Sequence, residues 1–344
     1  MKWLAVFAGG LLLLFISMLT ALCYGTVSLE WKVIWQTIFQ EFFTSHVFIY
    51  GTVDPVHDIV WLLRLPRVLL AAAVGAGLAV SGTVMQAVVK NPLADPYILG
   101  ISAGASLGAT IGVFGGLEKY FGMYAVGVSA FLGALCIAWL VTAASCGSPR
   151  GSAVKLLLVG MAFNAVCSAL TGGIVYFANS MEGIQTITYW LMGSLSGASW
   201  ETLLLAYPAV GAGILFFWTR SRVLNLMLIG EESAITLGYE LRRHRNIFLG
   251  VTALLVGTAV FSAGIIGFLG LLIPHIVRMI TGNNHKTLIP FAALGGAVFL
   301  VWADLACRIV IRGTELPIGI LVSSIGGPVF ILLLLKSRYG FGGE

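Results

Sequence analysis

The apolar run from Leu62 to Val89 constrains this chain more than any other stretch. It is about 28 residues long, or roughly 40 Å as a helix, and about 20 to 25 apolar residues suffice to cross a bilayer. Its only charges, Arg64 and Arg67, flank Pro66 at the mouth of the run. The stretch therefore predicts a long helix that spans a membrane.

A second apolar run follows after a break at 90–92 and carries glycine at every fourth position. These glycines are Gly100, Gly104, Gly108, Gly112 and Gly116. Residues four apart share one face of a helix, and glycine on that face lets another backbone approach closely. We expect a helix over 96–116 that packs tightly against a neighbour.

Composition favours a membrane protein throughout. The chain is 59% hydrophobic and 10% charged, whereas about 25% of residues are charged in soluble domains. The net charge of +5 comes from basic residues scattered over short loops without a basic face, which excludes nucleic acid as a partner. The five cysteines are far apart and form no CxxC pair, so neither a metal site nor a disulfide framework is expected.

The apolar pattern predicts an all-α polytopic membrane protein with ten transmembrane helices in a single domain over 1–344. The ten segments are 3–24, 62–89, 96–116, 121–145, 156–177, 201–218, 247–266, 268–281, 287–307 and 317–335. Residues 25–60 are expected to form an external loop with an amphipathic helix around 31–43. Residues 178–199 are polar and then amphipathic but too short to span, which favours a re-entrant half-helix before helix 6.

The distribution of lysine and arginine predicts the orientation. If the connections alternate sides, 13 of the 19 basic residues fall on the side of the two chain ends. Cytoplasmic loops carry the excess of basic residues, so both termini are expected in the cytoplasm.

Enzyme signatures are weak. Gly100 to Gly104 match the GxSxG nucleophile pattern, but that pattern needs a strand-to-helix elbow, and here it lies in the glycine-rich helix. The chain contains no GxxxxGK[ST] loop for ATP phosphates. We expect it not to be catalytic.

Ionisable groups are also rare inside the predicted helices, whereas secondary transporters and channels usually keep them there. Asp304 and Arg308, one turn apart at the end of helix 9, are placed to pair with each other. A stand-alone secondary transporter or channel is the alternative function from another class.

Several motifs then occur in a specific order. They are RLPR (64–67), SGxxMQ (81–86), NPLADP (91–96), LGISAGAS (99–106), YWLMGSLSGASW (189–200), GEESAITLG (230–238), GFLGLLIPHIVR (267–278) and ELPIG (315–319), the last preceded by Asp304. In this order they resemble the permease subunit of ABC importers for iron chelates and vitamin B12, over about residues 60–336.

The resemblance implies a transport subunit of the bacterial cytoplasmic (inner) membrane. Its implied partners are a second copy of itself, two ATPase subunits, an extracytoplasmic substrate-binding protein and membrane lipid. ATP and magnesium would bind to the ATPase, so this chain itself needs no cofactor. The implied cargo is an iron chelate, either a siderophore complex or haem, with vitamin B12 as the alternative.

The resemblance also assigns roles to residues at both ends of the helices. Binding-protein docking falls on Arg64, Arg67 and Arg308, although arginines at helix ends also commonly anchor them at lipid headgroups. ATPase coupling falls on the cytoplasmic segment 220–246, at Gly230, Glu231, Ala234, Leu237 and Gly238. Its alternating apolar and acidic residues predict two short helices joined at glycine, and the alternative is a plain connecting loop. The inner gate falls on Asn91 and Leu93.

The transport pathway is expected at the interface of two copies, lined by helices 5 and 10 and the re-entrant piece. In helix 5 a mildly polar stripe recurs at spacings of three and four, so its members share one face. They are Met161, Asn164, Ser168 and Thr171. Helix 10 offers Ser323 and Ser324. Helix–helix packing is an equally good explanation of the stripe.

Overall fold

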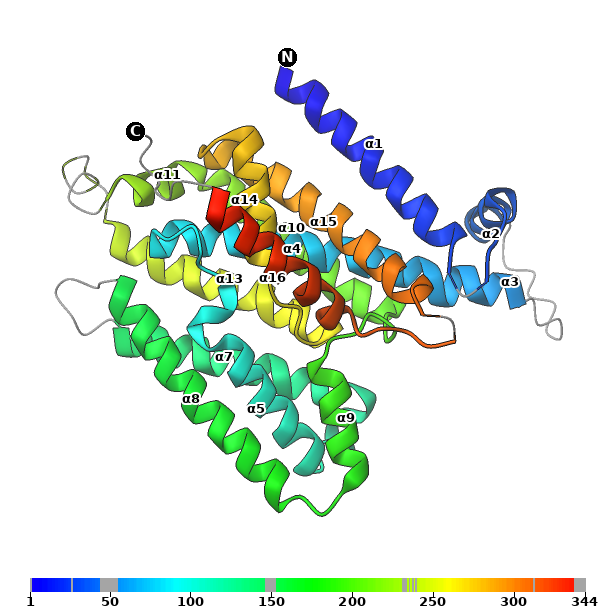
Figure 1. Ribbon diagram of the computed structural model, residues 1–344, viewed down its shortest axis with the longest axis horizontal. Helices are drawn as coiled ribbons and strands as arrows, with labels where there is room; N and C mark the ends of the chain where they lie inside the picture. Colours follow the sequence, from blue (N-terminus) through cyan, green and yellow to red (C-terminus); the bar gives the residue numbers. More distant parts are fainter. Residues whose placement is uncertain are drawn as a thin grey trace.

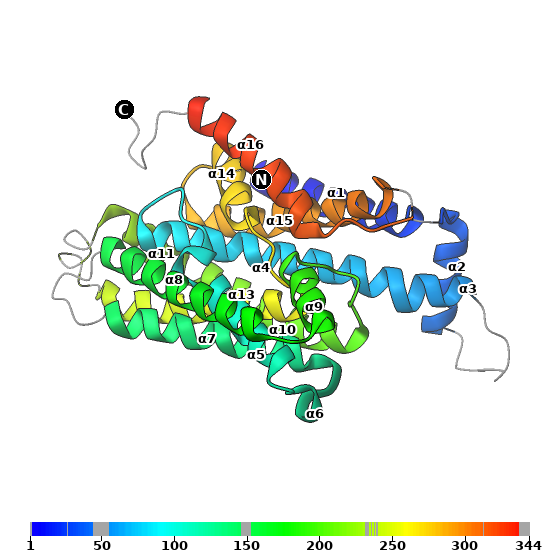
Figure 2. The same cartoon turned by 60° about the horizontal axis from the view of Figure 1, so that its bottom comes forward.

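The fold is that of a computed structural model, which describes residues 2–25, 27–43, 55–145, 153–230, 234, 236, 238, 240–311 and 313–336. Every regular element among them is a helix (Figure 1, Figure 2). The first half contains α1 (Lys2–Cys23), α2 (Trp31–Phe43), α3 (Pro55–His57), η1 (Asp58–Arg64), α4 (Leu65–Val89), η2 (Pro96–Leu99), α5 (Ile101–Phe114), α6 (Glu118–Phe121), η3 (Gly122–Tyr124) and α7 (Ala125–Ser145). The second half contains α8 (Ala153–Phe177), α9 (Met181–Leu191), α10 (Trp200–Thr219), α11 (Ser221–Ile229), α13 (Leu241–Ala263), α14 (Leu269–Thr281), α15 (His285–Ile309) and α16 (Ile318–Lys336).

Each of the ten predicted segments contains a helix. Seven helical stretches in the described part of the chain are long and apolar enough to cross a membrane. The helices in the other three segments, α5, α14 and α16, offer shorter apolar stretches. A multi-pass membrane fold is therefore confirmed, whereas the count of ten crossings stays a prediction.

Helix α4 is the centre of the bundle. In the apolar stretch from Pro55 to Val89, 94% of the residues in the most hydrophobic 18-residue segment are buried. Helices α10, α13, α14 and α15 pack around α4. Glycine makes this possible at two crossings, because a Cβ on Gly75 would collide with the backbone of Gly296, and one on Gly82 with the backbone of Gly270. The helix axes can approach only where neither side carries a side chain.

The glycines at every fourth position pack against another helix, as predicted, but the helix that carries them has different ends. A Cβ on Gly104 would lie 2.7 Å from the carbonyl oxygen of Gly133, and one on Gly108 would collide with Ser129, so α5 packs backbone to backbone on α7. Gly100 and Gly116 adopt left-handed φ angles of 75° and 67°. They therefore lie outside the α-helix, which is shorter than the predicted 96–116.

The remaining predicted segments are found with small shifts. The amphipathic helix expected around 31–43 is α2. The central span begins earlier than predicted, since α3 and the π-helical η1 continue into α4 and form one apolar stretch from Pro55 to Val89. Helix α9, in the predicted re-entrant region, has 11 residues, too few to cross a bilayer.

Candidate functional site

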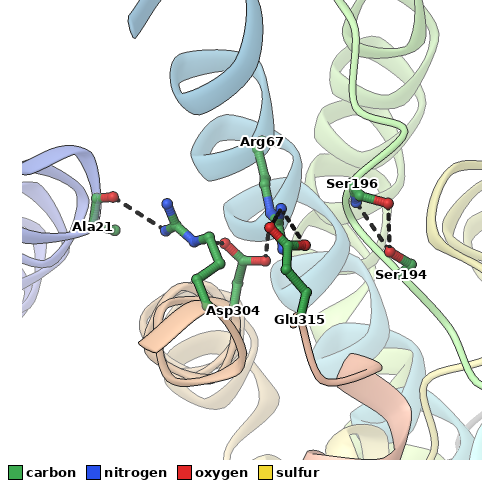
Figure 3. Close-up of polar contacts among 7 residues, drawn as sticks. Ala21, Arg67, Ser194, Ser196, Asp304 and Glu315 are labelled. Atoms are coloured by element: carbon green, nitrogen blue, oxygen red, sulfur yellow. Dashed lines mark hydrogen bonds and ion pairs between the residues drawn. The ribbon is translucent and has the colours of Figure 1, made fainter. Parts of the chain in front are cut away.

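Four charged side chains join at the end of the bundle where α4 begins and α15 ends (Figure 3). Arg67 Nε donates to Asp304 Oδ1 at 2.8 Å, and Arg67 Nη1 lies 2.8 Å from Glu315 Oε2. Arg308 Nε lies 3.1 Å from the second Asp304 oxygen, one turn along α15, as the sequence predicted. The two arginines and two carboxylates balance in charge. We call these four residues the outer ion network.

Asp304 is the hub of this network. Only 1% of its side chain is exposed, against 40% for Glu315. A buried carboxylate requires ion-pair and hydrogen-bond partners, because their attraction must offset the free energy lost when the charge leaves water. With arginines on α4 and α15 both directed at it, Asp304 holds two helices in register.

Two arginines also tie α1 to the bundle. Arg64 Nη1 donates to the carbonyl oxygen of Leu22 at 2.6 Å, and Arg64 Nη2 donates to that of Val27. Arg308 Nη2 donates to the carbonyl oxygen of Ala21 at 3.1 Å. These carbonyls belong to the last turn of α1 and the segment after it, where a helix leaves its carbonyls unpaired.

The three arginines assigned to docking are thus brought to one end of the molecule, but all are engaged internally. Arg64 and Arg308 are buried, and the Arg67 side chain is 11% exposed. Binding-protein docking by these residues stays a prediction. The most exposed member of the outer ion network is Glu315, whose pairing with Arg67 was not predicted. The sequence feature that could have indicated it is a lone carboxylate between two apolar helices.

The segment after α9 packs between the start of α16 and the end of α13. The backbone N–H of Ser194 donates to Ala263 at 2.9 Å, and that of Ile318 donates to Gly193 at 3.1 Å. The Ser194 and Ser196 hydroxyls lie 2.8 Å apart, beside the outer ion network in Figure 3. The short α9 is therefore fixed at this end of the bundle by the backbone that follows it.

The polar stripe of α8 faces outward. Met161 is 61% exposed, and Asn164 and Ser168 are also exposed, whereas Thr171 is partly covered. On α16, Ser324 is exposed and Ser323 partly so. Both sets thus lie at the surface of a single chain, on two separate helices (Figure 2). Their role in a pathway stays a prediction.

The turn after α4 is built by local side-chain caps. Asn91 Oδ1 accepts from the backbone N–H of Leu93 at 2.9 Å, and Asp95 Oδ1 accepts from that of Tyr97 at 2.8 Å. Burial raises the pKa of Asp95 to about 6. The predicted gate residues Asn91 and Leu93 therefore form one compact turn, and their gating role stays a prediction.

The predicted coupling segment begins with α11, the first of its two expected short helices. Gly230 ends that helix with a φ of 130°, Ala234 is buried, and Gly238 has a φ of 80°. Glu231 and Leu237 lie outside the described residues. A function in ATPase coupling stays a prediction for all five positions.

Helix α11 is joined to the start of α15 by side chains that the sequence analysis did not single out. Asn225 Oδ1 accepts from the backbone N–H of His285 at 2.9 Å and lies 2.7 Å from its Nδ1. Asn225 Nδ2 donates to Asn284 Oδ1 at 3.1 Å. The His285 side chain is fully buried. The sequence features that could have indicated this contact are a histidine and two asparagines beside polar turns.

A second buried contact at this end joins α4 and α14. Arg278 Nη2 donates to Gln86 Oε1 at 2.7 Å, and Gln86 Nε2 reaches the carbonyl oxygen of Leu271 at 3.4 Å. Gln86 is fully buried. Both residues lie in motifs quoted above, yet their contact was not predicted because the sequence does not show which helices are neighbours.

Comparison with known proteins agrees with this architecture. Residues 12–336 match the model of the FecCD transport family. The chain is 40% identical to the hemin transport system permease protein HmuU of Yersinia pestis, over 95% of this chain and 94% of that protein. It is 41% identical to the vitamin B12 import system permease protein BtuC of Escherichia coli, over 81% of this chain and 84% of that protein.

A solved structure extends the agreement to three dimensions. It is described as an inward-facing conformation of a metal-chelate type ABC transporter, with a TM-score of 0.84 and 33% sequence identity over 97% of this chain and 99% of that chain. The match covers nearly the whole length in sequence and in fold, and the chain belongs to the FecCD transport family.

Proposed function

We propose that this chain is the membrane-spanning subunit of an ATP-driven importer that carries an iron chelate, either haem or a siderophore complex, into the cytoplasm. The observation that carries the proposal is the 40% identity to a hemin permease over 95% of this chain. Vitamin B12 is the second candidate cargo, because the B12 permease is as similar in identity, over 81% of the chain.

The pathway is proposed to form between two copies of the chain. The polar stripe of α8 and the serines of α16 lie at the surface of one copy. Alone they enclose nothing, but facing the same elements of a second copy they would line a mildly polar channel. Such a pathway has few specific contacts, so selectivity is assigned to the external binding protein.

The energy source is proposed to be a pair of separate ATPase subunits. Secondary transporters keep ionisable groups within their crossing helices to bind coupling ions, whereas the buried carboxylate of the crossing helix α15, Asp304, is already paired with Arg67 and Arg308. The α11 segment is proposed to bind the ATPase subunits and to transmit their movement, since Asn225 joins it to the start of α15. Nucleotide-driven movement of α11 would then shift α15 and the central α4 between outward- and inward-open states.

The end of the bundle that carries α11 is proposed to face the cytoplasm of a bacterial cell. Helix α1 begins at this end, where Trp3 packs on Phe291, and α16 ends there (Figure 1). The first turn of α1 and the last turn of α16 thus lie at the same end of the bundle as α11. The outer ion network, at the opposite end, would face the binding protein.

Reconstitution into liposomes tests the proposal. The chain is combined with its cognate ATPases inside and its binding protein outside, and uptake of labelled haem, a ferric siderophore and cobalamin is measured with and without internal ATP. ATP-dependent uptake of an iron chelate, insensitive to a protonophore, is expected. Accumulation against a gradient by the chain alone would overturn the proposal, and preferential cobalamin uptake would favour the second cargo.

A further inference from the structure

A large apolar groove lies on the bundle between α1 and α10. Its volume is about 1040 Å³, and all its lining residues come from α1, α4, α10 and α15. The floor consists of small side chains, including Ala73 and Ala76 of α4 and Ala297 of α15. No residue of α8 or α16 lines it, so it is separate from the proposed pathway.

The groove exists because α1 packs mainly on α15 and leaves a space between itself and α10. The rings of Trp3 and Phe7 pack edge-on against Phe291, at centroid distances of 5.8 and 5.6 Å. Further along, Trp302 Nε1 donates to Ser17 Oγ at 2.9 Å. On the facing helix α10, a Cβ on Gly211 would meet no atom within 4 Å. The space between α1 and α10 is therefore open to the surroundings.

The groove is longer than one leaflet of the hydrocarbon core is thick. Along α1 its lining extends from Trp3 to Met18, which is roughly 23 Å at about 1.5 Å per residue. Half of the hydrocarbon core of a bilayer is about 15 Å thick. An apolar groove of this length has room for a whole acyl chain that enters from one surface.

The end of the groove nearest α11 has the chemistry of a headgroup site. Lys286 lies there in an exposed position, and in the described part of the chain its ammonium has no ion-pair partner. Trp218 Nε1 donates to the Lys286 carbonyl oxygen at 3.0 Å, which fixes the backbone under the lysine. Tryptophan and lysine together mark the membrane–water interface.

We propose that this groove binds an anionic phospholipid, with one acyl chain between α1 and α10 and the headgroup phosphate at Lys286. The apolar walls accept the chain irrespective of headgroup, and Lys286 provides the preference for negative charge. A single lysine near the membrane surface contributes about a fivefold preference for anionic over zwitterionic lipid. The bound lipid would fill the space between α1 and α10 and so complete the packing of α1 on the side away from α15.

Native mass spectrometry of the purified full-length chain tests this with phosphatidylglycerol and phosphatidylethanolamine added in turn. The unchanged protein is expected to bind phosphatidylglycerol about fivefold more tightly. Lys286→Gln should make the two lipids bind equally, whereas Lys155→Gln, at the corresponding end of α8, should keep the preference. Gly211→Leu should fill the groove and reduce binding of both lipids. Gly250→Leu, at another exposed helix position with no atom within 4 Å, should not.

Three results would overturn the proposal: equal binding of both lipids to the unchanged protein, a preference that survives Lys286→Gln, or equal lipid binding by the two leucine variants. A change in oligomeric state in Gly211→Leu with unchanged lipid binding would show that protein covers the groove, and would also overturn it. Lys286→Gln alters no packed side chain, so it tests the headgroup half even if Gly211→Leu does not fold.

Discussion

Arg67 Nε donates to Asp304 Oδ1 at 2.8 Å across 237 positions of sequence. This contact joins the start of α4 to the end of α15. Through Glu315 it extends to the segment before α16, and through Arg308 to the last turn of α1. Asp304 and its two arginine partners thus connect four chain segments at the proposed binding-protein side.

Asp304→Asn is expected to lower stability strongly. The amide keeps the shape of the side chain but leaves Arg67 and Arg308 without their shared buried countercharge, and breaking a buried pair in this way costs about 3–5 kcal/mol. The melting temperature of the purified chain in detergent measures the effect. Glu315→Gln is the control, because its 40% exposed side chain should contribute about 0–1 kcal/mol. Equal losses in the two variants would contradict the role of Asp304 as hub.

Arg67→Gln and Arg64→Lys are expected to differ in their effect on docking. Arg67→Gln removes a charge beside the exposed Glu315, so association of the binding protein should slow severalfold at low salt, and its rate should depend less on salt than that of the unchanged protein. This variant also loses the ion pair with Asp304, so its melting temperature should fall as well. Arg64→Lys keeps the charge but loses the forked contacts to the carbonyls of Leu22, in the last turn of α1, and of Val27 beyond it. It should lower the melting temperature and leave association unchanged. Stopped-flow binding to the permease in nanodiscs measures this, and unchanged association in Arg67→Gln would remove the docking assignment.

Gly82→Ala is expected to disrupt the packing of α4. Its Cβ would collide with the Gly270 backbone, which cannot move aside as a side chain can, and overpacking costs roughly 1–3 kcal/mol. Folded yield and melting temperature report the loss. Gly250→Ala introduces the same methyl group where no atom lies within 4 Å, and it should be neutral or stabilising because alanine favours helix. A neutral Gly82→Ala would contradict the close crossing.

The sequence predicted the helices well because each helix follows from the apolar residues of its own segment. Long apolar runs require crossing helices in a membrane, and the four-residue glycine spacing predicted a closely packed face on α5, which lies against α7 in the structure. The ends were less accurate, since the left-handed Gly100 separates η2 from α5. That conformation depends on the packing of Gly100 against α8, which the sequence does not display.

The candidate site was predicted only where its residues are near in sequence. The pair Asp304–Arg308 follows from helical spacing, and the resemblance to the permease family singled out the outer arginines. Contacts such as Gln86–Arg278 and Asn225–His285 join residues 192 and 60 positions apart. They depend on which helices become neighbours. The sequence therefore indicated arginines at the end of the helices, whereas in the fold Arg64 and Arg308 are buried.

Asp95 is expected to make stability depend on pH. Burial raises its pKa from 3.8 to about 6, so between these values the folded state binds more protons than the unfolded state, and stability falls as pH rises. The melting temperature should decrease from about pH 4 to about pH 6 and then level off with respect to this group. Asp95→Asn keeps an oxygen for the Tyr97 N–H and should flatten that part of the profile. An unchanged profile in Asp95→Asn would contradict the shifted pKa.

Asn225→Leu is expected to uncouple ATP hydrolysis from transport. Leucine has the same number and branching of side-chain heavy atoms as asparagine, but it loses the contacts that join α11 to His285 and Asn284. Movement of α11 would therefore no longer be transmitted rigidly to α15. The ATPase subunits should still bind, while the cargo transported per ATP hydrolysed falls severalfold in proteoliposomes. Asn283→Ala, exposed in the adjacent turn, is the matched control and should keep the ratio of the unchanged protein. If Asn225→Leu keeps that ratio as well, force reaches the bundle by another route, and the α11–α15 link is only structural.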